Sequence, residues 1–273
     1  MQYAYAYQLN GTQTAGLDPD AKAYILAVEA ADGQTLEVGV KKAYNTFVKG
    51  CKSDGIWNAI KASCIMAGAR TLSGALVPLK GTAPTNFNFV SGDYTRKTGL
   101  VGNNSTKYLN SSRTGNADPQ NNAHIAVWIS TITSGAGAVA PYYMGSGGLM
   151  TGAKGLLRRA QTLSLISHGV LPTSTTVASQ GPNPPLAGLF AYSRTGATAF
   201  TFSDSGAIYS DTIASQTPTS DDTFVFARNN ASGVAERYSN GRLAFYSIGD
   251  ALNLSQLNSR VSTLIADIAV AIP

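Results

Sequence analysis

The spacing of apolar residues changes along this chain, and the change limits the folds that it can adopt. From Asp18 to about Ala69, apolar side chains recur every three or four positions, as on one face of a helix. After Pro78 the chain divides into short runs rich in β-branched and aromatic residues, separated by Gly, Asn, Asp, Ser and Pro. The sequence therefore predicts a helical region at residues 17–78 and a larger β domain at residues 79–250.

Three helices are predicted in the first region. The first begins after Asp18, an N-cap followed by proline, and ends before Gly33. The second covers residues 36–51, and the third carries Ile56, Ile60 and Cys64 on one face. The only two cysteines, Cys51 and Cys64, fall in this region; they could form one disulfide, but buried free thiols are the simpler interpretation.

The β domain is predicted to be an antiparallel jelly-roll sandwich. No long helical crossover of the kind needed by a parallel sheet lies between its strands. The predicted strands are Asn86–Val90, Thr106–Ser111, His124–Ser130, Val139–Met144, Leu156–Ser167, Leu186–Ser193, Ala197–Ser203, Thr223–Arg228 and Arg242–Ile248.

Both ends of the chain carry one-sided apolar patterns that need a partner. Residues 1–16 form a predicted β arm with Tyr3, Tyr5, Tyr7 and Leu9 on one face. Residues 251–273 form a predicted helix, and its assembly face consists of Leu257, Val261, Leu264 and Ile268. The arm must pair with the body of the protein or with another copy. The helix must pack against the N-terminal helices or against another subunit.

Composition argues against several classes of partner. The formal charge of +5 arises from few acidic residues, and the basic residues are scattered rather than gathered into a stripe with stacking aromatics. We therefore expect no nucleic-acid partner. The start of the chain lacks the pattern of a secretory signal, and no stretch is apolar enough for a membrane span, so we expect no membrane partner.

The residues that would support catalysis are sparse in the β region. Glu236 is its only glutamate, and a glycoside hydrolase needs two suitably spaced carboxylates. His124 and His168 stand alone, without a nucleophile pattern beside them. Asp221 and Asp222 could help to hold calcium, but the loop spacing of a calcium motif is missing. We expect a non-enzymatic protein with no cofactor and no metal site.

Five segments of the chain are distinctive in sequence. They are Asp54–Leu72 (DGIWNAIKASCIMAGARTL), Leu76–Asn86 (LVPLKGTAPTN), Asn88–Leu100 (NFVSGDYTRKTGL), Asn116–Asn122 (NADPQNN) and Arg242–Gly249 (RLAFYSIG). Together they resemble virion structural proteins of tailed bacteriophages that carry a concanavalin A-like or laminin-G-like lectin domain. The resemblance covers roughly residues 17–270, and it brings no catalytic or sugar-binding motif.

The resemblance implies a fold and a role in the particle. The fold would be mainly β, an antiparallel jelly-roll (concanavalin A-like) sandwich with a small helical N-terminal region and a C-terminal helix. The role would be that of a capsid decoration or cement subunit, or of a tail-fibre component, located in the virion. Its partners would be other virion proteins and copies of itself. A module that binds host-surface glycan is the alternative, and a polysaccharide depolymerase is a more distant one.

Overall fold

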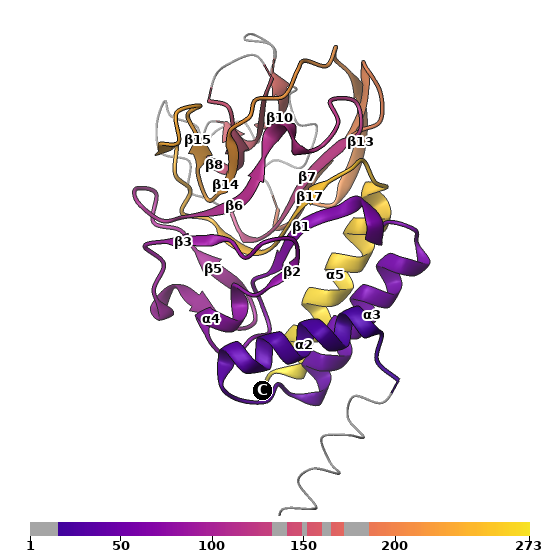
Figure 1. The fold of residues 1–273 in the computed structure, drawn as a ribbon, viewed down its shortest axis with the longest axis vertical. Coiled ribbons are helices and arrows are strands. Elements are labelled where there is room, and N and C mark those ends of the chain that lie inside the picture. The colour runs from indigo at the N-terminus through magenta and orange to yellow at the C-terminus, as the bar shows by residue number, and fades with distance from the viewer. Residues whose placement is uncertain (1–15, 133–140, 149–151, 160–164, 172–185) are drawn as a thin grey trace, which may run out of the picture.

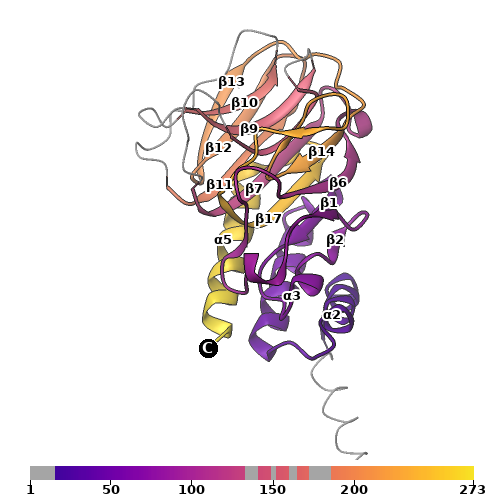
Figure 2. The same cartoon turned by 90° about the vertical axis from the view of Figure 1, so that its left-hand side faces the viewer.

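A computed structural model describes residues 16–132, 141–148, 152–159, 165–171 and 186–273. The described chain is mainly β and forms three layers: a layer of helices, a first sheet (sheet A) and a second sheet (sheet B) (Figure 1). Figure 2 shows the helices gathered on one side of the two sheets. The two sheets form a sandwich, and most of their strand pairs are antiparallel.

Sheet A has the strand order β13-β12-β11-β7-β17-β1-β2, with β5 also paired with β17 and β4 with β5. Its strands are β1 (Ile60–Ile65), β2 (Pro78–Lys80), β4 (Tyr94–Thr95), β5 (Gly99–Val101), β7 (Ala123–Thr131), β11 (Gly188–Arg194), β12 (Ala199–Asp204), β13 (Ala207–Thr212) and β17 (Arg242–Gly249).

Sheet B has the order β10-β9-β8-β14-β6-β3, and a short ribbon of β15 and β16 extends from β8. Its strands are β3 (Thr85–Phe87), β6 (Tyr108–Thr114), β8 (Tyr142–Ser146), β9 (Ala153–Arg159), β10 (Leu165–Leu171), β14 (Asp222–Val225), β15 (Arg228–Asn229) and β16 (Ala235–Glu236). β15 runs parallel to β8, so this sheet is mixed.

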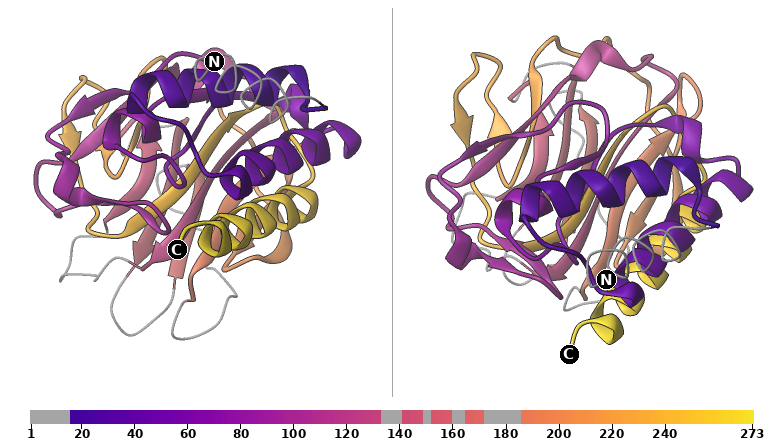
Figure 3. Two further views of the ribbon diagram at one scale, coloured as in Figure 1. Left: turned by 90° about the horizontal axis from the view of Figure 1, so that it is seen from below. Right: turned by 60° about the horizontal axis from the view of Figure 1, so that its bottom comes forward.

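The helical layer consists of α2 (Pro19–Asp32), α3 (Val38–Ser53) and α5 (Leu254–Ala271) (Figure 3). A single further turn, α4 (Leu72–Ala75), packs against α2. The predicted ends of the first helix are confirmed: Asp18 accepts a hydrogen bond from Asp20 N (3.0 Å), and Gly33 adopts a left-handed φ of 66°. The C-terminal helix is confirmed as well, with Asn253 as its N-cap.

Two apolar cores hold the three layers together. The alternation of side chains along β7 serves both: Ile125, Val127 and Ile129 pack between the two sheets, whereas Ala126 and Trp128 face the helices. Sheet A is therefore buried on both faces, and sheet B leaves its outer face uncovered by helices.

The third predicted helix is wrong. Residues Trp57–Ala59 form a short 3-10 turn, and Ile60–Ile65 form β1, which pairs with β17 and β2. Ile60 faces the helices while Cys64 faces the sandwich core. A strand buried on both faces loses its alternating pattern, so the spacing of its apolar residues imitates that of a helix.

The predicted strand Leu156–Ser167 is also wrong in part, because two antiparallel strands, β9 and β10, occupy this region. Most other predicted strands are confirmed within a few residues. The short strands β2 and β5 and the edge strand β13 were not predicted. The side chains of β13 are exposed or half-buried, so its sequence lacks a buried face.

Candidate functional site

The predicted assembly face of the C-terminal helix is buried inside the chain itself. Leu257, Val261, Leu264 and Ile268 each expose at most 1% of their surface, and they belong to the core between the helices and sheet A. α5 packs against α3 and β11. Of the two partners considered for this face, the N-terminal helices are the one it meets, so the prediction that it is an assembly surface is wrong.

The predicted assembly arm lies outside the described residues. Tyr3, Tyr5, Tyr7 and Leu9 all precede Gly16, where the described chain begins. The pairing of this arm stays a prediction.

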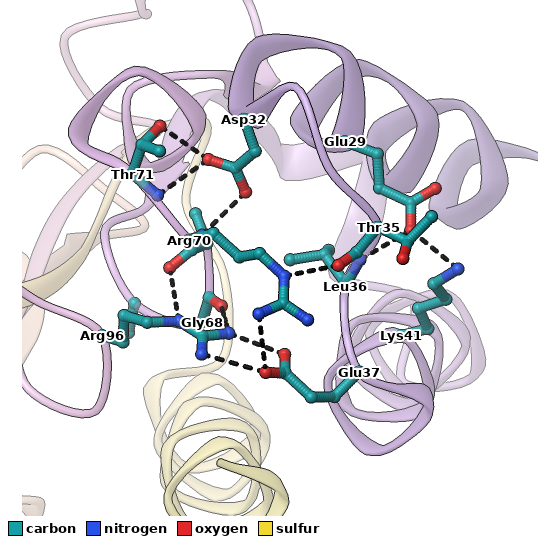
Figure 4. Close-up of polar contacts among 12 residues, drawn as sticks. Glu29, Asp32, Thr35, Leu36, Glu37, Lys41, Gly68, Arg70, Thr71 and Arg96 are labelled. Atoms are coloured by element: carbon teal, nitrogen blue, oxygen red, sulfur yellow. Dashed lines mark hydrogen bonds and ion pairs between the residues drawn. The ribbon is translucent and has the colours of Figure 1, made fainter. Parts of the chain in front are cut away.

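A network of charged groups fixes the helical layer to the rest of the chain (Figure 4). Glu37, the residue before α3, accepts hydrogen bonds from Arg96 Nη1 (2.9 Å) and Nη2 (2.6 Å), and Arg70 Nη1 lies 3.2 Å from the same carboxylate. The two hydrogen bonds from Arg96 hold the pKa of Glu37 below its usual range. The carboxylate therefore joins α3 to two arginines outside the helical layer.

A second carboxylate extends this network to α4. Asp32, the last residue of α2, accepts hydrogen bonds from Arg70 N (2.7 Å), Thr71 N (2.8 Å) and Thr71 Oγ1 (2.7 Å). These bonds satisfy backbone donors at the start of α4, which would otherwise lack partners. The charged groups of the network are occupied by structural bonds, so its role is to fix the helices in place.

Exposed apolar side chains lie at the end of the helical layer beside the C-terminus. Val38, at the start of α3, is 61% exposed, and Val270, near the end of α5, is 87% exposed. The two helices approach closely at the residues that follow these valines, where a Cβ on Gly39 would lie 2.6 Å from the Cβ of Ala271. We call Val38 and Val270 the base patch. Side chains of this kind are candidates for contact with another protein.

A hollow of about 620 Å³ lies between α2 and the edge strand β2, with Trp57 on its wall. The indole Nε1 donates a hydrogen bond to Asp20 (3.1 Å), and Lys80 Nζ lies 4.4 Å from the ring centroid. Burial lowers the pKa of Lys80. Asp20 is the one carboxylate among the described residues that line the hollow, and it also pairs with Lys52. The hollow therefore lacks the two free carboxylates that glycoside hydrolysis needs.

A row of aromatic rings crosses the outer face of sheet B. The rings of Phe87 and Tyr108 are stacked with centroids 4.3 Å apart, and Tyr108 also contacts Phe224 (4.7 Å) and Tyr238 (6.2 Å). Phe87 is 37% exposed on the edge strand β3, whereas Phe224 is buried. We call these four residues the aromatic platform. Half-exposed rings of this kind can stack on an apolar face of a ligand.

Phe87 and Tyr108 fall in predicted strands, but they were not predicted to form a surface. One signal for Tyr108 was available: it precedes the buried Leu109, so alternation sends its ring to the opposite face of β6. The pairing of Phe87 with Tyr108 depends on the register between β3 and β6, which the sequence does not reveal.

Three of the residues considered for catalysis are held by structural hydrogen bonds, and the side chain of the fourth, His168, lies outside the described part of the chain. Glu236 is bound to Arg228 through Nε (3.1 Å) and Nη2 (2.6 Å), and Asp222 accepts a hydrogen bond from Asn110 (2.8 Å). His124 is fully buried between the carbonyl of Asp250 and the hydroxyl of Ser247, as expected for a structural histidine.

Neither a metal cluster nor a membrane-spanning helix is found in the described parts of the chain. No group of three or more His, Cys, Asp or Glu side chains is arranged there to hold a metal ion. The same residues include no helix that is both long and apolar enough to cross a membrane. Cys51 and Cys64 are both free and buried, so they are not bridged to each other.

Comparison with known proteins identifies no family. Neither a family model nor a curated protein sequence matches the chain. Among solved structures, the chain is similar to NanB sialidase from Streptococcus pneumoniae, with 11% identity, a TM-score of 0.44, and coverage of 59% of this chain and 27% of that one. Domain 4 of AbnA, a GH43 extracellular arabinanase from Geobacillus stearothermophilus, gives 14% identity, a TM-score of 0.40, and coverage of 66% and 82%.

A third similar structure is the binding domain of botulinum neurotoxin serotype D, with 11% identity, a TM-score of 0.45, and coverage of 77% of this chain and 51% of that one. The chain spans about a quarter of the length of the sialidase that it matches. All three TM-scores are below 0.5.

Proposed function

We propose that this chain is a non-enzymatic structural protein of a tailed-bacteriophage virion. It is displayed on the outside of the particle, as a capsid decoration or cement subunit or as part of a tail appendage, and it acts through contacts with other virion proteins and with copies of itself. The sequence resemblance of residues 17–270 supports this role. We also propose that the two sheets form the concanavalin A-like jelly roll that the resemblance implies.

The base patch is the observation that carries the assembly role. Val38 and Val270 are exposed on the helical layer, next to the C-terminus, and sheet B lies on the other side of sheet A. A subunit built in this way can attach through its helices and keep the outer face of sheet B free. Exposed apolar side chains at the attachment surface favour protein contacts, because they leave water when a partner covers them.

Incorporation into particles tests this proposal. Particles are assembled with the wild-type chain or with the double variant Val38→Asp/Val270→Asp, and the bound chain is quantified by mass spectrometry of purified particles. The double variant should be lost from the particles while its thermal unfolding stays close to that of the wild type. Val234→Asp is the matched control, because Val234 is 57% exposed outside the helical layer. Equal incorporation of the double variant would remove the base patch from the proposal.

The aromatic platform favours a second function, the binding of a host-surface glycan. A pyranose ring presents an apolar face that can stack on an exposed aromatic side chain, and Phe87 offers such a surface at the edge of sheet B. This function is compatible with the first, since the platform and the base patch lie on different layers.

A glycan array followed by calorimetry tests the second function. Phe87→Ala should weaken any glycan found on the array by about tenfold, which corresponds to a stacking contribution of about 1.4 kcal/mol. Leu186→Ala is the matched control, because Leu186 is an exposed apolar residue outside the platform. Equal losses in both variants, or the absence of any bound glycan on the array, would argue against the platform as a sugar site.

A further inference from the structure

The inner face of sheet B changes from apolar to polar along three neighbouring strands. An apolar row crosses β9, β8 and β14 within the sandwich core; it consists of Leu156, Met144 and Val225. Two positions further along the same strands stand Lys154, Ser146 and Thr223, which we call the polar row. Side chains two residues apart in a strand point to the same face, so the polar row also points between the two sheets.

Each member of the polar row is buried without a hydrogen-bond partner. Lys154 exposes only 3% of its surface, and Ser146 and Thr223 expose none. Within the described residues, Lys154 Nζ, Ser146 Oγ and Thr223 Oγ1 bond to nothing, and Thr219 Oγ1 shares this condition. A native fold rarely leaves several buried polar atoms unsatisfied in one place, so the cluster indicates a missing partner.

Two of these hydroxyl groups lie close together beside Gly115. Ser146 Oγ and Thr219 Oγ1 lie 3.2 Å and 3.5 Å from the position that a Cβ on Gly115 would occupy, and the Thr219 carbonyl oxygen lies 2.7 Å from it. Ser146 is also the register partner of Lys154, so the ammonium and this hydroxyl rise from adjacent positions on neighbouring strands. Hydroxyl and ammonium groups can all donate hydrogen bonds to a single acceptor.

The charges around the polar row are unbalanced toward positive. Asp118 attracts the Lys154 ammonium electrostatically, but Arg113 already binds this carboxylate through Nε (3.1 Å) and Nη2. Two cations, Lys154 and Arg113, thus share one carboxylate. His124 also interacts electrostatically with Asp118 and Lys154. Burial lowers the pKa of His124 to about 4, so the imidazole adds no positive charge at neutral pH.

We propose that the polar row binds a small inorganic anion between the two sheets. Lys154 supplies the charge, and the hydroxyls of Ser146, Thr223 and Thr219 donate hydrogen bonds to the ion. A buried ammonium without a counter-charge is strongly unfavourable, and an anion removes that cost. A water molecule would satisfy the hydroxyls but would leave the charge uncompensated. Burial lowers the pKa of Lys154 to about 8, and a bound anion would raise it again.

Anion-dependent thermal stability tests this site. Unfolding is followed in sodium bromide or sodium sulfate at pH 7, with sodium gluconate at equal ionic strength as the reference for a bulky anion. One of the two small anions should raise the Tm of the wild type saturably, by about 5–10 °C at one hundred times its Kd.

The variants separate a specific site from a general salt effect. Lys154→Met removes the charge and keeps a side chain of similar length, and it should abolish the saturable rise. Lys49→Met is the matched control, because Lys49 is exposed on α3 and the net charge changes equally. Should Lys154→Met not fold, the double variant Ser146→Ala/Thr223→Val retains the lysine and should weaken the same anion at least tenfold.

Crystals grown in bromide locate the ion directly. An anomalous peak within hydrogen-bond distance of Lys154 Nζ is the expected result. The proposal is overturned when Lys154→Met gains as much stability from the anion as the wild type does. It is also overturned when the wild type shows no saturable effect, or when only water without anomalous signal occupies the polar row.

Discussion

Shortening Leu257 to alanine should destabilise the folded chain and leave its oligomeric state unchanged. Leu257 is fully buried in the core where α5 meets α3 and sheet A. Removing a buried leucine side chain costs about 2–5 kcal/mol, because apolar contacts are lost and a cavity remains, and we take about 3 kcal/mol for this site. For a chain of this size each kcal/mol lowers Tm by about 2–4 °C, so Leu257→Ala should lower Tm by about 6–12 °C.

Thermal unfolding followed by circular dichroism measures this loss, and sedimentation velocity measures the oligomeric state of the same samples. Val270→Ala is the control on the same helix; Val270 is exposed, so its shortening should change the free energy of unfolding by less than about 0.5 kcal/mol. The reasoning fails if Leu257→Ala keeps the wild-type Tm and instead sediments as a smaller species. That result would show that this face of α5 forms a contact between subunits, as the sequence predicted.

Three further predictions concern titratable groups. Glu37→Gln should lose about 1–3 kcal/mol at pH 7. Because the folded pKa of Glu37 is lowered, the wild type alone should lose this advantage as the pH falls below about 4.5 in urea titrations, and parallel acid profiles would contradict the role of Arg96. Burial raises the pKa of the Cys51 thiol to about 12 and also raises that of Cys64. A thiol reagent at pH 8 should therefore label both cysteines only in denaturant. Labelling of the native protein would show that the thiols are accessible. Burial lowers the pKa of His124 to about 4, so its NMR signals should stay constant from about pH 5 to 7, and a midpoint near 6.5 would show an exposed ring.

The helix ends were predictable because their signals are local. Asp18 before Pro19, Gly33 after the first helix and Asn253 before the last each act within a few residues of their own position. The apolar stripe of the C-terminal helix was equally clear. The packing partner of this helix could not be predicted, because α5 packs against α3, whose residues lie about 200 positions earlier in the chain.

The error at β1 has a different cause. Ile60, Cys64 and Ile65 are all buried because helices cover one face of the strand and sheet B covers the other. Apolar spacing identifies a strand only when one of its faces meets water. A strand in the middle of a three-layer structure therefore gives the same apolar pattern as a buried helix. The Trp57–Ala59 turn directly before β1 is itself helical, so the sequence also shows no break between the two elements.

The polar row shows why the sequence could not disclose the most unusual chemistry of this chain. Lys154, Ser146 and Thr223 are each unremarkable in sequence, where a lysine near a glycine-rich turn resembles any exposed lysine. Register alone brings them level with one another on three strands, and the facing sheet then removes them from water. Burial of a lysine among unsatisfied hydroxyls lowers the stability of the folded state unless another group compensates the charge. The bromide and Lys154→Met experiments decide whether a bound anion compensates the charge of Lys154.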